Sequence, residues 1–211
     1  MKPFLLTIGD RNLSSWSLRA WLAVVVSGAP FEEEIVRLDQ PDTNALLAQR
    51  SPTARVPVLR HGEIVVWDSL AICEYVAELY PDAQLWPADV HRRAHARAVS
   101  AEMHSGFAAL RRQLPMNIAT RLPTPSLSID AQTDLARVLA LLEDCRARYA
   151  GTGPYLFGSF SIADCMYAPV LTRFTTYGID LSDVLARYRT MVYARPAMQR
   201  WIAAAEAEIT A

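Results

Sequence analysis

Two adjacent serines at the expected start of a helix are the first residues with a chemical use. Ser14 and Ser15 follow a buried strand expected at Phe4–Ile8 and a polar turn, and they precede an apolar stripe at helical spacing. A helix N-terminus carries unpaired N–H groups and a partial positive charge, so it stabilises an anion. A thiol, with an ordinary pKa of about 8.5, is acidified at such a place. A serine hydroxyl there can donate a hydrogen bond to a thiolate without ionising. The plainer interpretation is an ordinary serine N-cap with a second serine beside it.

Cysteine is absent from the segment 14–17, which reads Ser-Ser-Trp-Ser. Thiol–disulfide exchange in this loop would need a nucleophilic cysteine, so that chemistry is not expected. The three cysteines, Cys73, Cys145 and Cys165, are odd in number and lie in helical patterns without Cys-x-x-Cys spacing. They predict no disulfide framework and fit a reduced, cytoplasmic location.

The segment 55–69 combines two short strands with a capped helix start. Apolar and β-branched residues predict strands at 55–60 and 63–67, joined by a tight turn at His61-Gly62. Asp68 and Ser69 then stand where a helix N-cap is expected, and that helix should stop at Tyr80 before Pro81. Pro57 is unusual at the start of a strand because it cannot donate to the ladder. A cis Val56-Pro57 bond would resolve this and leave the Val56 amide and carbonyl free at a sheet edge.

This combination resembles the glutathione-binding half of the cytosolic glutathione S-transferases. In that family the bond before the proline is cis, and the residue before it pairs through its backbone with the cysteinyl part of glutathione. The acid–serine pair holds the γ-glutamyl end. The resemblance therefore implies a glutathione site at Val56, Pro57, Asp68 and Ser69. Arg55 either pairs with the glycine carboxylate, as a basic residue does in some relatives, or is a solvated loop arginine.

The Ser-Ser-x-Ser run followed by an arginine is similar to the serine-dependent zeta and theta transferases. The first serine matches the zeta catalytic position, so the resemblance implies that Ser14 faces the sulfur and that Ser15 lies close to it. Trp16 stands where zeta enzymes carry a cysteine. The implied activity is attack of the glutathione thiolate on an electrophilic small molecule. Two alternatives remain: a zeta-like cis–trans isomerase of the maleylacetoacetate type, and a non-catalytic glutathione-fold binding or regulatory protein.

The element order positions these residues. Strands are expected at Phe4–Ile8 and 34–38, and helices after the serines, with Leu18, Trp21, Leu22 and Val25 on the apolar face, and at 42–49. With the hairpin and its helix, this order is compatible with an α/β thioredoxin-like domain at 1–80. Gly28 is placed to cap the first helix. A linker at 81–87 leads to an all-α domain at 90–211, which completes the transferase fold. Its expected helices are 88–115, 130–149, 161–176, 181–193 and 196–209.

Within the helical domain, Ser161 and Asp164 have the spacing of a capping box, which indicates a folding role. Met103 and Phe107 recur at helical spacing, which by itself indicates core packing. In the family, the first helices of this domain wall the electrophile pocket. The resemblance therefore implies a substrate pocket that contains Trp16, Met103, Phe107, Met116 and Asn117.

Composition narrows the classes of function. Of the 211 residues, 52% are hydrophobic and 20% charged, and the net charge of −1 argues against a nucleic-acid partner. The uncharged run 20–31 is too short to span a bilayer, so no membrane partner is expected. His91 and His95 have a metal-compatible spacing but no evident third ligand, so no metal site is expected. The family resemblance implies a homodimer.

Overall fold

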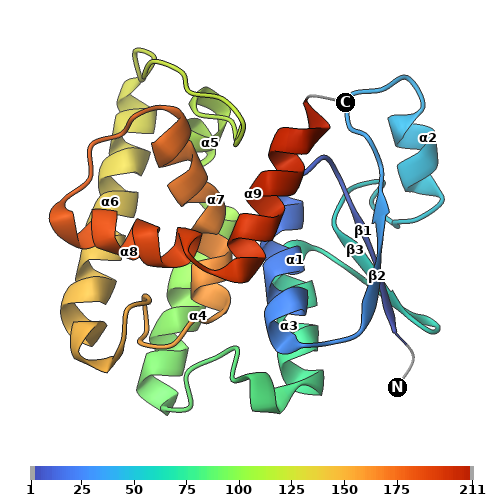
Figure 1. The fold of residues 1–211 in the computed structure, drawn as a ribbon, viewed down its shortest axis with the longest axis horizontal. Coiled ribbons are helices and arrows are strands. Elements are labelled where there is room, and N and C mark those ends of the chain that lie inside the picture. The colour runs from blue at the N-terminus through green and yellow to red at the C-terminus, as the bar shows by residue number, and fades with distance from the viewer. Residues whose placement is uncertain (1–2, 210–211) are drawn as a thin grey trace.

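A four-stranded sheet forms the first part of the chain, and the regular elements that follow it are helices (Figure 1). The computed structural model describes residues 3–209. The first part contains β1 (Phe4–Ile8), α1 (Ser15–Ser27), β2 (Phe31–Ile35), α2 (Thr43–Ala48), β3 (Val58–His61), β4 (Ile64–Trp67) and α3 (Ser69–Leu79). The second contains α4 (Val90–Ser105), α5 (Ala108–Gln113), α6 (Ile129–Tyr149), α7 (Ile162–Thr176), α8 (Asp183–Tyr193) and α9 (Pro196–Glu208), with single 3-10 turns at Pro81–Ala83 and Ala150–Thr152. This is the α/β plus all-α arrangement expected from the sequence.

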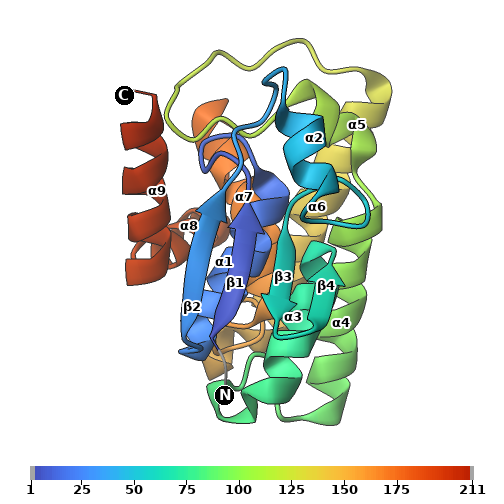
Figure 2. The same cartoon turned by 90° about the vertical axis from the view of Figure 1, so that its right-hand side faces the viewer.

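The sheet has the strand order β2-β1-β3-β4 (Figure 2). β1 pairs with β2 in parallel, with Phe4 opposite Phe31, and with β3 in an antiparallel ladder. Phe4, Leu6 and Ile8 are buried, as a central strand covered on its faces requires. β1 is therefore the fixed element from which the loop leading to Ser14 departs.

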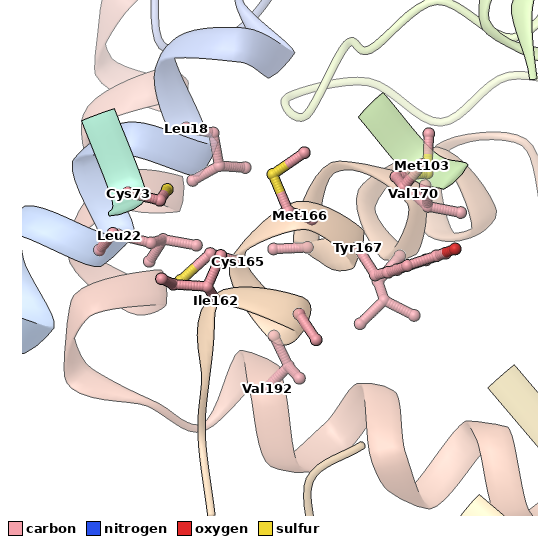
Figure 3. Close-up of a cluster of buried hydrophobic side chains, with 14 of the residues drawn as sticks. Leu18, Leu22, Cys73, Met103, Ile162, Cys165, Met166, Tyr167, Val170 and Val192 are labelled. Atoms are coloured by element: carbon pink, nitrogen blue, oxygen red, sulfur yellow. The ribbon is translucent and has the colours of Figure 1, made fainter. Parts of the chain in front are cut away.

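Helices cover the sheet unequally. α1 and α3 lie between the sheet and the helical part of the chain, whereas α2 lies on the opposite face (Figure 1). α7 packs against α1 and α4, and its apolar side chains form the centre of a buried cluster (Figure 3). In that cluster Leu18 and Leu22 of α1 face Ile162, Cys165 and Met166 of α7. The packing ties α1 to the helical half, so the start of α1 lies at the boundary between the two halves.

Several expected local features are confirmed. The Val56-Pro57 bond is cis. Asp68 is the N-cap of α3, and its carboxylate accepts hydrogen bonds from the backbone N–H groups of Leu70 and Ala71. Gly28 caps α1 in the left-handed conformation at φ 74°. The two helix caps follow from local sequence chemistry, whereas the cis bond was expected from the family resemblance.

Three expected positions are wrong by one to three residues, one of them the strand expected at 55–60, which is β3 at Val58–His61. The second strand is Phe31–Ile35 rather than 34–38, because Phe31 pairs with Phe4 and the run Glu32–Glu34 lies on an edge strand. Charged residues are common at sheet edges, where they discourage further strand pairing. The hairpin turn is formed by Gly62 and Glu63, since His61 already pairs with Ile64. Gly62 has φ 62°, which a tight hairpin turn requires.

The single helix expected at 88–115 is also wrong, because the chain breaks between α4 and α5. Gly106 ends α4, and a Cβ at this position would lie 2.8 Å from the Glu102 carbonyl oxygen. Phe107 then takes a left-handed conformation at φ 58°. The N-terminus of α5 is capped from a distance, since Asp134 of α6 accepts hydrogen bonds from the N–H groups of Ala109 and Leu110. The apolar periodicity continues through the break and therefore hides it.

The capping box at the start of α7 is confirmed, and it is fully buried. Asp164 accepts hydrogen bonds from the Ser161 N–H at 2.8 Å and from the Leu156 N–H at 3.1 Å. The hydroxyls of Ser161 and Tyr188 donate to the same carboxylate at 3.1 and 3.0 Å. One side chain thus joins α7, α8 and the loop before α7.

We expect Asp164→Ala to destabilise the protein by about 3 kcal/mol, because a cap is lost and several buried donors lose their acceptor. Ser128→Ala, which removes the exposed N-cap of α6, is the matched control and should cost about 1 kcal/mol. Denaturant unfolding followed by circular dichroism measures both. Equal costs for the two variants would contradict this role of Asp164.

Candidate functional site

Two adjoining cavities lie where the sheet edge and the start of α1 meet the helical half. The smaller, of about 310 Å³, is lined by Val56, Pro57, Asp68, Ser69 and His104, among others. The larger, of about 730 Å³, contains both serines at the start of α1 and reaches the arginines of α5 and α7. Trp16, Arg55 and Val56 line both cavities. The two spaces therefore form a continuous site, divided at these three residues.

The start of α1 offers donors toward the larger cavity. Ser14 is the N-cap, and its hydroxyl oxygen lies 3.4 Å from the Ser17 N–H and 2.7 Å from the Ser17 Oγ. Ser15 is the first helical residue and its N–H donates to the Leu13 carbonyl at 3.1 Å. Within residues 3–209, the Trp16 N–H has no hydrogen-bond partner. A free N–H at this helix position is a donor available to an anion.

The smaller cavity has the features that bind a peptide-like ligand. Val56 lies outside the β3 ladder, which begins at Val58, so its backbone amide and carbonyl are unpaired by the described part of the chain. Ser69 is buried, and its hydroxyl likewise has no partner. Because buried polar groups are normally hydrogen-bonded, an unpaired hydroxyl at a cavity wall indicates a ligand contact. Asp68 keeps one carboxylate oxygen on the α3 N-terminus and turns the other toward the helical half.

His104 of α4 closes the smaller cavity from the helical half, a role that the sequence did not indicate. Its Nε2 lies 3.1 Å from the second carboxylate oxygen of Asp68. Its ring meets the Trp16 ring edge-on, with centroids 5.3 Å apart. The His104 Nδ1 is buried and unpaired by any residue from 3 to 209. His104 therefore adds an ionisable side chain with one unpaired ring nitrogen to the residues that line the cavity with Ser69.

Arginines give the larger cavity a positive character. Arg55, Arg111, Arg112 and Arg173 line it, against the single carboxylate of Asp39. Arg173 is buried and donates to the backbone carbonyls of Leu114 and Pro169, and burial with the nearby Arg111 lowers its pKa to about 10. An arginine with a lowered pKa is still protonated at pH 7. The cavity wall is therefore cationic.

Arg19 of α1 adds a buried positive charge beside Trp16. Its guanidinium lies 4.3 Å from the Trp16 ring centroid, and that of Arg111 lies 5.1 Å from the same ring. Burial, together with the charges of Arg173 and Arg111, lowers the pKa of Arg19 to about 9. Its Nε donates to the Met166 carbonyl, but neither terminal nitrogen has a partner in the described chain. A buried cation without a carboxylate partner raises the positive potential at the start of α1.

The residues expected to form the electrophile pocket separate into two groups. Trp16 and Met116 line the larger cavity. Met103 and Phe107 lie in the hydrophobic core and line neither cavity. Asn117 accepts a hydrogen bond from the Asn12 side chain at 2.9 Å and also lies outside the two linings. Arg111 and Arg173 also line the cavity. Their position could not be predicted from the sequence, since no local motif indicates that arginines of α5 and α7 converge.

Known proteins resemble the chain in sequence and in fold. The family model described as "Glutathione S-transferase, N-terminal domain" matches residues 13–79, and the C-terminal domain model of that name matches 93–204. A probable maleylacetoacetate isomerase from Caenorhabditis elegans is 29% identical over 173 residues, which cover 82% of this chain and 79% of that protein. The match to the N-terminal domain model includes both serines, Val56-Pro57 and Asp68-Ser69.

Solved structures resemble the chain over nearly its full length. A Burkholderia glutathione transferase homologue with bound glutathione is 28% identical, with a TM-score of 0.75 and coverage of 98% of this chain and 99% of that one. The theta-class glutathione S-transferase of Xanthomonas axonopodis pv. citri with glutathione bound is 26% identical, with a TM-score of 0.69 and coverage of 96% and 98%. Each of these two related structures contains bound glutathione.

We expect Ser69→Ala to weaken glutathione binding about tenfold, or 1.4 kcal/mol, because one hydrogen bond to a charged group is lost. The melting temperature should stay unchanged, because the Ser69 hydroxyl makes no hydrogen bond within the described chain. Ser105→Ala, on the exposed side of α4, is the control. Isothermal titration calorimetry measures the affinity, and wild-type affinity in Ser69→Ala would rule out this contact.

Proposed function

The chain belongs to the glutathione S-transferase family, and from that premise we propose that it activates the glutathione thiol for attack on an electrophilic small molecule. In this proposal a glutathione-binding domain, residues 1–80, holds the tripeptide, and a helical domain, residues 90–211, supplies most of the electrophile wall. By analogy with the family, we also propose that the protein is a cytoplasmic homodimer.

One observation carries the proposal: the same pair of cavities presents open groups for each part of glutathione. Ser69 and Asp68 suit the γ-glutamyl carboxylate and ammonium, and the unpaired backbone of Val56 suits the cysteinyl peptide group. Arg55 lies beside Val56 and is placed to meet the glycine carboxylate. The cysteinyl sulfur then lies toward the serines and the N-terminus of α1, inside the larger cavity.

The thiol loses its proton to solvent on binding, and the thiolate is held by a serine hydroxyl and the N-terminus of α1. The helix dipole and the free Trp16 N–H favour the charged form of the sulfur. The unpaired guanidinium of Arg19 acts in the same direction. The thiolate then forms a bond to the electrophilic carbon, and the leaving group departs with the electron pair of the broken bond.

A second candidate is cis–trans isomerisation, and the cationic wall favours it. A maleylacetoacetate-type substrate carries carboxylates, which Arg111 and Arg173 are suited to bind. In that reaction the thiolate adds to a double bond, the adduct rotates, and the thiolate leaves again. The sequence similarity to a probable isomerase of this kind supports the same candidate.

A panel of assays with purified wild-type protein separates these functions. Conjugation consumes glutathione, whereas isomerisation of maleylacetone proceeds without net consumption. Glutathione binding with no turnover of any electrophile would instead favour a binding or regulatory protein. Absence of glutathione binding would contradict the proposal as a whole.

We expect Arg111→Gln to raise the KM for a carboxylate-bearing electrophile about tenfold, since the loss of one charge-assisted hydrogen bond costs roughly 1.5 kcal/mol. The KM for a neutral electrophile should stay unchanged. Arg137→Gln, which removes an exposed partner of Glu102, is the control. Steady-state kinetics with both substrates provide the test, and equal effects on the two would refute an anion-binding role.

A further inference from the structure

We propose that Ser15, rather than Ser14, donates the hydrogen bond to the glutathione thiolate. The inference rests on the proposed function and identifies which serine hydroxyl binds the thiolate. The resemblance to the zeta transferases implies the first serine of the pair. The hydrogen bonds at the start of α1 favour the second serine instead.

The Ser14 hydroxyl is already committed inside the protein. It donates to the Ser17 Oγ at 2.7 Å and accepts from the Ser17 N–H at 3.4 Å. Ser17 is fully buried, and its hydroxyl oxygen also accepts from the Gly9 N–H at 3.0 Å. To reach a ligand, the Ser14 hydroxyl would have to give up the helix cap and a buried hydrogen bond, each of which stabilises the folded chain.

The Ser15 hydroxyl is uncommitted. Ser15 lines the larger cavity, only 7% of the residue is exposed, and its hydroxyl has no hydrogen-bond partner among residues 3–209. A hydroxyl hydrogen rotates freely about its C–O bond, so it can turn toward an acceptor in the cavity at little cost. The Ser15 hydroxyl is therefore preorganised as a donor, whereas the Ser14 hydroxyl is not.

The next residue supplies a second donor. The Trp16 N–H is free in the described structure and belongs to the same first turn of α1. A sulfur held by the Ser15 hydroxyl and this N–H receives two hydrogen bonds at the positive end of the helix. Ser14 then serves as the N-cap of α1, and Ser15 binds the thiolate.

The first test measures the pKa of the bound glutathione thiol from its ultraviolet thiolate absorbance. Ser15→Ala should raise this pKa by about one unit, a tenfold loss of thiolate at a pH below both values. Ser14→Gly is the matched variant, because glycine replaces serine at an N-cap with little loss of stability. It should move the thiol pKa less than half as far. A larger shift in Ser14→Gly than in Ser15→Ala would overturn the assignment.

A second test keeps the side-chain size and so preserves the fold. In Ser15→Cys the new thiolate should attack one sulfur of glutathione disulfide, form a mixed disulfide and release one glutathione thiolate. Mass spectrometry of the intact protein would detect the added glutathionyl group. Ser14→Cys should stay unmodified, because its side chain points to Ser17. Glutathionylation of Ser14→Cys with an unmodified Ser15→Cys would overturn the assignment.

The three native cysteines should not react with glutathione disulfide in this experiment. Burial raises the pKa of Cys145 to about 12, and it also raises the pKa of Cys73 and of Cys165. All three are buried and free, so wild-type protein should remain unmodified.

Failure of the inference differs from failure of the proposed function. If wild-type protein binds no glutathione, or leaves the thiol pKa at its solution value, the proposed function and this assignment fall together. If wild-type protein lowers the pKa and Ser14 alone is responsible, the function stands and only the assignment to Ser15 is wrong.

Discussion

The site depends on a fixed start for helix α1, and that start is held by segments far away in the sequence. Asn12 accepts hydrogen bonds through its carbonyl and side-chain oxygens from the N–H groups of Ile118 and Ala119. Its own N–H donates to Glu208 of α9, while the Trp201 indole donates to the Arg11 carbonyl. A helix dipole stabilises an anion only where its first turn stays in place, since the effect falls off within that turn. The C-terminal helix therefore helps to fix the start of α1, although it lines neither cavity.

Buried positive charge is the second constraint, and it runs against folding stability. Within residues 3–209 Arg19 and Arg173 are buried without carboxylate partners, and burial lowers the pKa of each because it disfavours the charged form. The same desolvation strengthens their attraction to any anion that enters. A bound thiolate, or a carboxylate on the electrophile, would offset part of the cost that the folded protein carries. Binding and stability are thus linked: ligand anions should raise the resistance to unfolding.

Local chemistry explains which parts of the molecule could be predicted from sequence. Helix caps depend on neighbouring residues, so the start of α3, the end of α1 and the capping box of α7 could be predicted from the sequence. The contact between His104 and Asp68 joins positions 36 apart, and no periodicity encodes it. The helix break at Phe107 could not be predicted, because an apolar residue fits the helical pattern whether or not its backbone continues the helix. The residue types at the site are visible in the sequence, but the sequence does not show which distant residues meet there.

Trp16, Arg55 and Val56 line both cavities and form the junction between them, where the proposed function places the sulfur of glutathione. The wall of the larger cavity rests on the same support, since Met116 adjoins Asn117, whose side chain accepts a hydrogen bond from the Asn12 side chain. A substitution that moves residues 115–119 would therefore displace the loop that carries Ser14 and Ser15 as well as the pocket wall. In the proposed function, Asn12 therefore links substrate preference to thiol activation, because its hydrogen bonds position both the start of α1 and residues 117–119 beside the cavity wall.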